Sequence, residues 1–191
     1  RVDVKKMRSG EFDDNDWQRI GVAVGSLVNC NLYFDDTSTI TVPEMKAKLR
    51  RMKKVDLCVI DYLGLMQSTT NTDNRAQQVG EISRGLKLMA KDLGIPILCC
   101  AQLNRGTEQR GGEAKKPTLS DLRDSGSIEQ DADIVMFLYR ESYYQQQEGV
   151  ATPEADTVEV IVAKNRHGET GTATLCWDGQ FTKFTTLEED R

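Results

Sequence analysis

The stretch V-D-L-C-V-I-D-Y-L-G-L-M, residues 55–66, decides the fold that this sequence predicts. Its first part is an apolar run that ends on Asp61, and such a run is typical of a strand buried on both faces of a parallel sheet. Ligands of open α/β sheets bind at the carboxyl edge of the strands, and an acid there can hold Mg²⁺ through water. A strand-terminal Asp is more often a turn former or a helix cap, so the rest of the chain has to decide.

Length, charge and cysteine usage narrow the class of protein. The chain has 191 residues, of which 38% are hydrophobic and 29% charged, as in an ordinary globular domain. Its net charge of -5 excludes a general polyanion binder, so contact with nucleic acid would need a local patch. No apolar run approaches the roughly 20 residues that span a bilayer, and no signal peptide is present. Five cysteines without a C-x-x-C spacing predict packed, reduced thiols in a cytoplasmic protein.

Three helices are predicted from apolar periodicity and capping residues, over residues 13–29, 41–52 and 75–93. Each carries a stripe that we expect to face the core: Trp17, Ile20, Val24 and Leu27; Met45, Leu49 and Met52; and Val79, Ile82, Leu86, Met89 and Leu93. The basic residues on the other face of the second helix are expected to be solvated.

Strands are predicted on both sides of these helices, over residues 31–34, 95–101, 133–139, 158–163 and 172–177, with a short last strand over 181–184. Alternation of strands and helices with short connections predicts a parallel sheet. The strands 158–163 and 172–177 are so closely joined that they predict an antiparallel hairpin. Residues 104–118 and 145–156 are predicted to be loops. The predicted fold class is therefore α/β, one mostly parallel sheet flanked by helices with a C-terminal antiparallel hairpin.

Polar residues follow three of the predicted strands. Asp61 and Gln102 each end an apolar run, and Lys164 and Arg166 stand at the hairpin tip. We expect all four at one edge of the sheet, where an acid, an amide and a Lys-x-Arg tip form a plausible set for phosphoryl transfer. The planar arginine side chain suits spread phosphate charge. The sequence contains no G-x-x-x-x-G-K-[ST] phosphate loop and no acid obviously placed as general base.

Six segments resemble the DnaB-type replicative helicases in sequence, order and spacing. They are I-D-Y-L-x-L-M (60–66), E-I-S-R-x-L-K (81–87), A-K-x-L-x-I-P (90–96), Q-L-N-R (102–105), D-L-R-x-S-G-S-I-E-Q-D-A-D (121–133) and K-x-R-x-G (164–168). The resemblance covers nearly the whole chain and is to the C-terminal, RecA-like motor domain, a P-loop NTPase core. It begins downstream of that domain's phosphate loop and general base. Residues 1–191 are therefore expected to be a partial RecA-like domain, and the first residues, Arg1-Val2-Asp3, also suggest a piece of a longer polypeptide.

The resemblance implies a role in ATP hydrolysis for five positions. Asp61 would be the Walker B acid on Mg²⁺, and Gln102 would sense the γ-phosphate of ATP and couple it to the DNA loops. Lys164, Asn165 and Arg166 would reach the nucleotide of the neighbouring subunit, with Arg166 as the arginine finger in trans. The sequence N-R-H at 165–167 departs conservatively from the usual Q-R-N, and Gly64 stands where the family usually has Gln.

The resemblance also implies DNA and protein partners. Arg123, Asp124 and Gly126, with Arg105, would hold single-stranded DNA in a central pore, although Asp124 replaces the usual Glu. The implied assembly is a homo-hexamer that meets a primase and a helicase loader. Without a phosphate loop, the isolated chain is expected to be inactive as an ATPase. Two alternatives stay open: a RecA- or clock-type ATPase scaffold, and a nucleotide-independent DNA-binding module that uses the basic loop 105–123.

Overall fold

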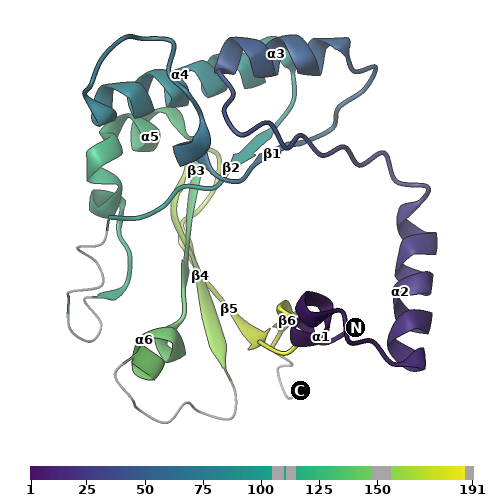
Figure 1. Cartoon of the computed structure of the whole chain (residues 1–191). Helices are drawn as coiled ribbons and strands as arrows, with labels where there is room; N and C mark the ends of the chain where they lie inside the picture. The colour runs from purple at the N-terminus through teal and green to yellow at the C-terminus, as the bar shows by residue number, and fades with distance from the viewer. Residues whose placement is uncertain (105–109, 111–114, 148–155, 188–191) are drawn as a thin grey trace. The chain divides into compact units, whose positions relative to one another are not determined.

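The computed structural model describes residues 1–104, 110, 115–147 and 156–187. Contacts divide the chain into two compact units: residues 1–36, 138–160 and 172–191 form unit 1, and residues 37–137 and 161–171 form unit 2. Figure 1 labels the helices and strands of the chain. In the described part of the chain, no helix has the length and apolar character needed to cross a membrane.

Unit 2 is built around a parallel strand pair and a long helix. Strand β1 (Cys58–Ile60) pairs in parallel with β2 (Ile97–Cys99), so that Cys58 lies opposite Ile97 and Ile60 opposite Cys99. Helix α4 (Arg75–Leu93) joins them, capped by the Asn74 side chain and ended by Gly94 in the left-handed conformation that glycine adopts without strain. The predicted strand–helix–strand unit is therefore confirmed, with strands shorter than expected.

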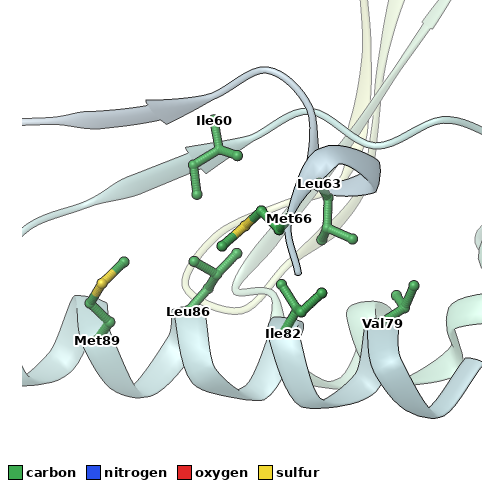
Figure 2. Close-up of a cluster of buried hydrophobic side chains, with 7 residues drawn as sticks. All are labelled: Ile60, Leu63, Met66, Val79, Ile82, Leu86 and Met89. Carbon is green, nitrogen blue, oxygen red and sulfur yellow. The ribbon is translucent and has the colours of Figure 1, made fainter. Parts of the chain in front are cut away.

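The core of unit 2 is the apolar stripe of α4. Ile82 and Met89 are only 1% exposed, and they pack with residues of β1 and of the segment that follows it. Figure 2 shows the α4 side chains pointing towards Ile60, Leu63 and Met66. Helix α3 (Val42–Arg51), which starts with the predicted Thr41–Glu44 capping box, adds Met45 and Leu49 to this cluster. The stripe predicted for α4 is confirmed, and so is that of α3 except for Met52, which follows the helix and is not part of the cluster.

The prediction that β1 is buried on both faces is wrong. Ile60 is buried, but Val59 on the opposite face is 56% exposed, and Leu98 of β2 is also exposed. Helix α4 covers one face of the strand pair, and successive side chains of a strand point to opposite faces. An apolar run shows that both faces of a strand carry apolar residues. It does not show whether other elements of the chain cover both faces.

The C-terminal strands form a second sheet with the hydrogen-bonded order β3-β4-β5-β6. The strands are β3 (Ile134–Tyr139), β4 (Thr157–Asn165), β5 (Gly171–Asp178) and β6 (Lys183–Thr186). Strands β5 and β6 are antiparallel, with Trp177 opposite Phe184. Val135 and Phe137 of β3 pack with Leu122 in a second core cluster of unit 2. The 3₁₀ helices η1 (Leu63–Leu65) and η4 (Leu119–Ser125) and helix α5 (Gly126–Asp131) complete that unit.

Unit 1 contains three helices, α1 (Val4–Ser9), α2 (Asp14–Leu27) and α6 (Glu141–Gln147). Helix α2 starts at the predicted acidic caps: Asp13 and Asp16 form a capping box, and Lys6 donates to both carboxylates over 2.7 and 2.5 Å. The side-chain hydrogen bond to Lys6 lowers the pKa of Asp13 to about 2.

Two predictions for unit 1 are wrong, and its helices α1 and α6 were not predicted. The stripe of α2 does not enter a core, since Trp17 is 59% exposed and Val24 and Leu27 are also exposed. Residues 31–34 form no strand, since no strand of the described residues pairs with them, and Phe34 is exposed. Helix α6 occupies the start of a stretch predicted to be a loop; residues 148–155 of that stretch lie outside the described residues.

All five cysteines are free, as predicted, but they are not all packed. Cys30 and Cys100 are exposed, whereas Cys58, Cys99 and Cys176 are partly buried. Burial is the main cause that raises the pKa of Cys99 to about 12, so its thiol stays protonated at neutral pH.

Candidate nucleotide site

Asp61 and Gln102 follow the two strands of the parallel pair at the same edge. Backbone hydrogen bonds continue past the strands, from Cys100 N to Ile60 O and from Leu63 N to Cys100 O, each 2.9 Å long. Asp61 and Gln102 are exposed, and neither side chain has a hydrogen-bond or ion-pair partner among the described residues. The predicted placement of an acid and an amide at one carboxyl edge is therefore confirmed.

The chain turns sharply after Asp61. A cis peptide bond joins Asp61 to Tyr62, and the 3₁₀ helix η1 follows. A Cβ atom on Gly64 would lie 2.3 Å from Cε2 of Tyr62, so the Tyr62 ring occupies the space that a side chain at position 64 would need. Glutamine at this position, as in the family pattern, would require the ring to move.

Polar contacts fasten the loop that follows η1 to helix α4. The Glu81 carboxylate accepts hydrogen bonds from the hydroxyls of Ser68, Thr69 and Thr70, and from the backbone amides of Thr69 and Thr70 over 3.2 Å. These hydrogen bonds, with that of Ser68 the largest cause, lower the pKa of Glu81 to about 2. Residues 68–70, between Asp61 and α4, are thus held to the helix by an ionised side chain.

The hairpin tip binds the end of helix α5 instead of the Asp61 edge. Lys164 Nζ donates to the carbonyl oxygens of Glu129 and, over 2.7 Å, Ala132, and Arg166 Nη2 donates to Gln130 O over 2.5 Å. Free carbonyls at a helix C-terminus attract cations. No hydrogen bond or ion pair among the described residues joins Lys164 or Arg166 to Asp61 or Gln102. The prediction that all four meet at one edge of the same chain is therefore not confirmed.

Asp133, the residue before β3, holds the base of this tip. Its carbonyl oxygen accepts a 2.9 Å hydrogen bond from Arg166 N, and its Oδ1 lies 3.7 Å from Arg166 Nη1. Its Oδ2 forms an ion pair with Lys87 Nζ of α4. Lys87 is the main cause that lowers the pKa of Asp133, so its carboxyl is ionised at neutral pH. Sequence reasoning did not identify Lys87 or Asp133 as a pair, because they lie far apart along the chain.

Asn165 shapes the turn between β4 and β5. Its Nδ2 donates to Glu169 O and its Oδ1 accepts from His167 N, both over 3.2 Å. A Cβ on Gly168 would lie 2.6 Å from Asn165 Nδ2, so a side chain there would require the Asn165 amide to move. In this chain, the amide predicted to bind nucleotide organises the turn that presents Arg166.

The predicted DNA-binding residues are only partly described. Arg105 and the side chains of Arg123 and Asp124 lie outside the described residues. Gly126 is exposed and begins α5. The preceding helix η4 starts with a capping box in which Thr118 N donates to Asp121 Oδ2 over 2.8 Å, and Arg110 pairs with the same buried carboxylate.

The donor set fits Mg²⁺ held through water and nucleotide phosphates. Within the described ranges, no three His, Cys, Asp or Glu side chains lie close enough together to cage a metal ion. Asp61 offers an exposed carboxylate at the strand edge. Mg²⁺ keeps several waters and binds one or two carboxylates together with substrate phosphates, so a single acid is sufficient.

Unit 1 contains a pocket of about 340 Å³ that sequence reasoning missed. Its lining is mostly aromatic and aliphatic: Leu138, Arg140, Tyr143, Tyr144, Val158, Trp177 and Phe184. The Arg140 guanidinium lies over the Trp177 ring at 5.6 Å and over the Tyr143 ring at 5.7 Å. A flat aromatic ligand could stack here. The arginine that follows β3 and the tryptophan of β5 are distant in sequence, so only the folded chain brings them together.

These features define an α/β domain with parallel strands, an acid and an amide at their carboxyl edge, and an antiparallel C-terminal sheet. The family model described as DnaB-like helicase C terminal domain matches residues 1–186, and the chain belongs to that family.

Known relatives agree with this assignment. The chain is 44% identical to the replicative DNA helicase DnaC of Bacillus subtilis and 43% identical to DnaB of Geobacillus stearothermophilus, and each match covers 98% of this chain but 41% of the relative. Among solved structures, it matches a DnaB-like replicative helicase, solved in a study of its interactions with primase, with a TM-score of 0.87 and 36% identity, covering 98% of this chain and 46% of that one. A separately solved ATPase domain gives the same TM-score and identity, and there the match covers 66% of the solved chain. The chain thus spans less than half the length of these curated relatives.

Proposed function

We propose that this chain is part of the ATP-driven motor of a hexameric replicative DNA helicase. The observation that carries the proposal is the placement of Asp61 and Gln102 at one carboxyl edge of a parallel strand pair. Membership of the DnaB-like C-terminal family and the names of its relatives support it. In the intact domain, the core is RecA-like, and residues 1–191 form the part that follows the phosphate loop.

The proposed chemistry divides between neighbouring subunits. Asp61 holds Mg²⁺ through water, and the ion neutralises phosphate charge when it is bound. Gln102, beside it, contacts the γ-phosphate of ATP and orients the attacking water. Arg166, together with Lys164 and the turn shaped by Asn165, reaches the nucleotide of the adjacent subunit and stabilises the charge on the transferred phosphoryl group.

The pocket of unit 1 suits a flat ring such as a nucleotide base. Trp177 and Phe184 offer apolar faces, and Arg140 supplies a cation already aligned with an aromatic ring. Base stacking on such side chains is worth roughly 1–3 kcal/mol per base. The aromatic and cationic lining of the pocket therefore favours a ring system over an aliphatic ligand.

Single-stranded DNA is the proposed track of the motor. The segment that contains Arg123, Asp124 and Gly126, together with Arg105, binds the DNA backbone without sequence preference. A primase and a helicase loader are the proposed protein partners, and the cytoplasm the proposed location. The relative studied with primase supports the first of these partners.

Two measurements on the full-length protein test the proposal: the rate of ATP hydrolysis and the displacement of one strand from duplex DNA. ATP hydrolysis should be stimulated by single-stranded DNA and be lost in Asp61→Ala and in Gln102→Ala. An ATPase scaffold of the RecA or clock type would hydrolyse ATP without displacing a DNA strand, and this outcome would overturn the helicase assignment.

A further inference from the structure

Helix α4 carries two ionic clamps on different partners. Glu81 holds residues 68–70, which follow Asp61, and Lys87 holds Asp133, which carries the hairpin tip. The two residues are six positions apart, about 9 Å along a helix. One rigid helix therefore supports both the Mg²⁺ side of the chain's own site and the arginine that would serve the next site.

The Asp133 carboxylate lies close to two cationic side chains, Lys87 and Arg166. Its Oδ2 is engaged by Lys87, whereas its Oδ1 and Arg166 Nη1 are 3.7 Å apart, too far for a hydrogen bond. Among the described residues, the Arg166 guanidinium is otherwise held by one carbonyl oxygen, Gln130 O. Lys87 thus engages the Asp133 carboxylate, which would otherwise bind Arg166 tightly.

Both side chains are partly exposed, which limits their value as a simple stabilising pair. The exposed fractions are 33% for Lys87 and 43% for Asp133. Ion pairs with this exposure contribute little to stability because water screens them. Their position at the base of the tip points to a role in placing Arg166.

We propose that Lys87 is a positioning residue for the arginine finger: by holding the Asp133 carboxylate, it leaves Arg166 free to reach the neighbouring subunit. Without Lys87, Asp133 closes on Arg166 and retains it on its own chain. Hydrolysis in the neighbour's site then falls, while the nucleotide still binds. This inference rests on the proposed function of Arg166 in trans.

Mixed hexamers of the full-length protein test the inference. Lys87→Met is mixed with Asp61→Ala, which removes the Mg²⁺ acid. If Lys87 acts through Arg166 in trans, some sites of the mixed ring are complete. Such a site takes its intact Asp61 from a Lys87→Met subunit and its correctly placed Arg166 from a neighbouring Asp61→Ala subunit. About a quarter of the sites in a randomly mixed head-to-tail ring are of this kind. Activity should therefore exceed that of either variant alone.

Three controls keep the outcomes distinct. Arg166→Ala mixed with Asp61→Ala should also recover activity, whereas Gln102→Ala mixed with Asp61→Ala should not. Lys91→Met, one turn further along α4 and exposed, should behave as wild type. If the Arg166→Ala mixture fails to recover activity, the proposed function of Arg166 is wrong. If it recovers and the Lys87→Met mixture does not, only the role of Lys87 is wrong.

Kinetics of the uniform variants add a second readout. We expect Lys87→Met to lower kcat about 10- to 100-fold with little change in KM, as for a misplaced catalytic group. Lys87→Arg should keep most activity, because it preserves the charge. Adding Asp133→Asn to Lys87→Met should restore kcat, since the neutral amide releases Arg166. If rings of the double variant still assemble and their kcat is no higher than that of Lys87→Met, the inference is overturned.

Discussion

The backbone amide of Arg166 donates a 2.9 Å hydrogen bond to the carbonyl oxygen of Asp133. This bond fixes the main chain of the hairpin tip to the start of β3, whatever side chain stands at either position. The Arg166 side chain beyond it is 45% exposed, and its guanidinium lies against the end of α5. The main chain at Arg166 is thus anchored while its side chain can be released.

Replacing Arg166 should therefore affect activity far more than stability. Arg166→Ala keeps the backbone hydrogen bond and loses only screened contacts, so its unfolding free energy should stay within about 1 kcal/mol of wild type. Denaturant unfolding measures this quantity, and hydrolysis by the assembled ring measures the loss of activity. A large loss of stability would show that the side chain mainly supports the fold.

The apolar stripe of α4 should determine the stability of unit 2. Leu86 is buried in the core cluster, whereas Leu88 on the same helix is 49% exposed. Leu86→Ala should cost about 2–5 kcal/mol of unfolding free energy, because it removes buried atoms and leaves a cavity. Leu88→Ala, the matched control, should cost at most about 0.5 kcal/mol. Equal costs in chemical denaturation would contradict the observed packing.

The Glu81 clamp should make stability depend on pH in the acid range. Its pKa falls from 4.5 to about 2 on folding, so its contribution is complete above about pH 4.5 and is lost as the pH falls towards 2. Glu81→Gln should flatten this part of the pH–stability curve and cost on the order of 1 kcal/mol at neutral pH. Glu169→Gln, at an exposed turn, is the control and should leave the curve unchanged. An unaltered curve in Glu81→Gln would argue against the clamp.

Nucleotide binding in the pocket of unit 1 should quench tryptophan fluorescence. The chain has two tryptophans, Trp17 and Trp177, and only Trp177 lines the pocket. In a Trp17→Phe background, ATP should therefore change the emission of Trp177, while inorganic triphosphate, which lacks a base, should not. An equal change with triphosphate would place the phosphates, not the base, near Trp177.

Local signals predicted much of this fold. The α4 stripe and the bounds of the helix follow from helical periodicity and from the glycine that ends it, signals that depend on neighbouring residues alone. The exposed face of Val59 was not predictable, because burial of a strand depends on layers elsewhere. The strand predicted at residues 31–34 failed for the same reason: extended residues need a partner strand.

The site was predicted in part for similar reasons. Asp61 and Gln102 lie together because parallel pairing fixes the register of β1 and β2. The attachment of Lys164 and Arg166 to α5, and the ion pair of Lys87 with Asp133, join segments with no common local pattern. Tertiary contacts of this kind leave no periodic signal, and the same holds for the stacking of Arg140 on Trp177.

Displacement of one strand from a forked duplex by the full-length protein tests the motor assignment. The comparison is between wild type, Asp61→Ala and Asp56→Ala, which removes an exposed carboxylate that lies 3.5 Å from Lys54 before β1. We predict ATP-dependent displacement by wild type and Asp56→Ala and none by Asp61→Ala. Displacement by Asp61→Ala at the wild-type rate, or hydrolysis of ATP by wild type without any displacement, would contradict the account.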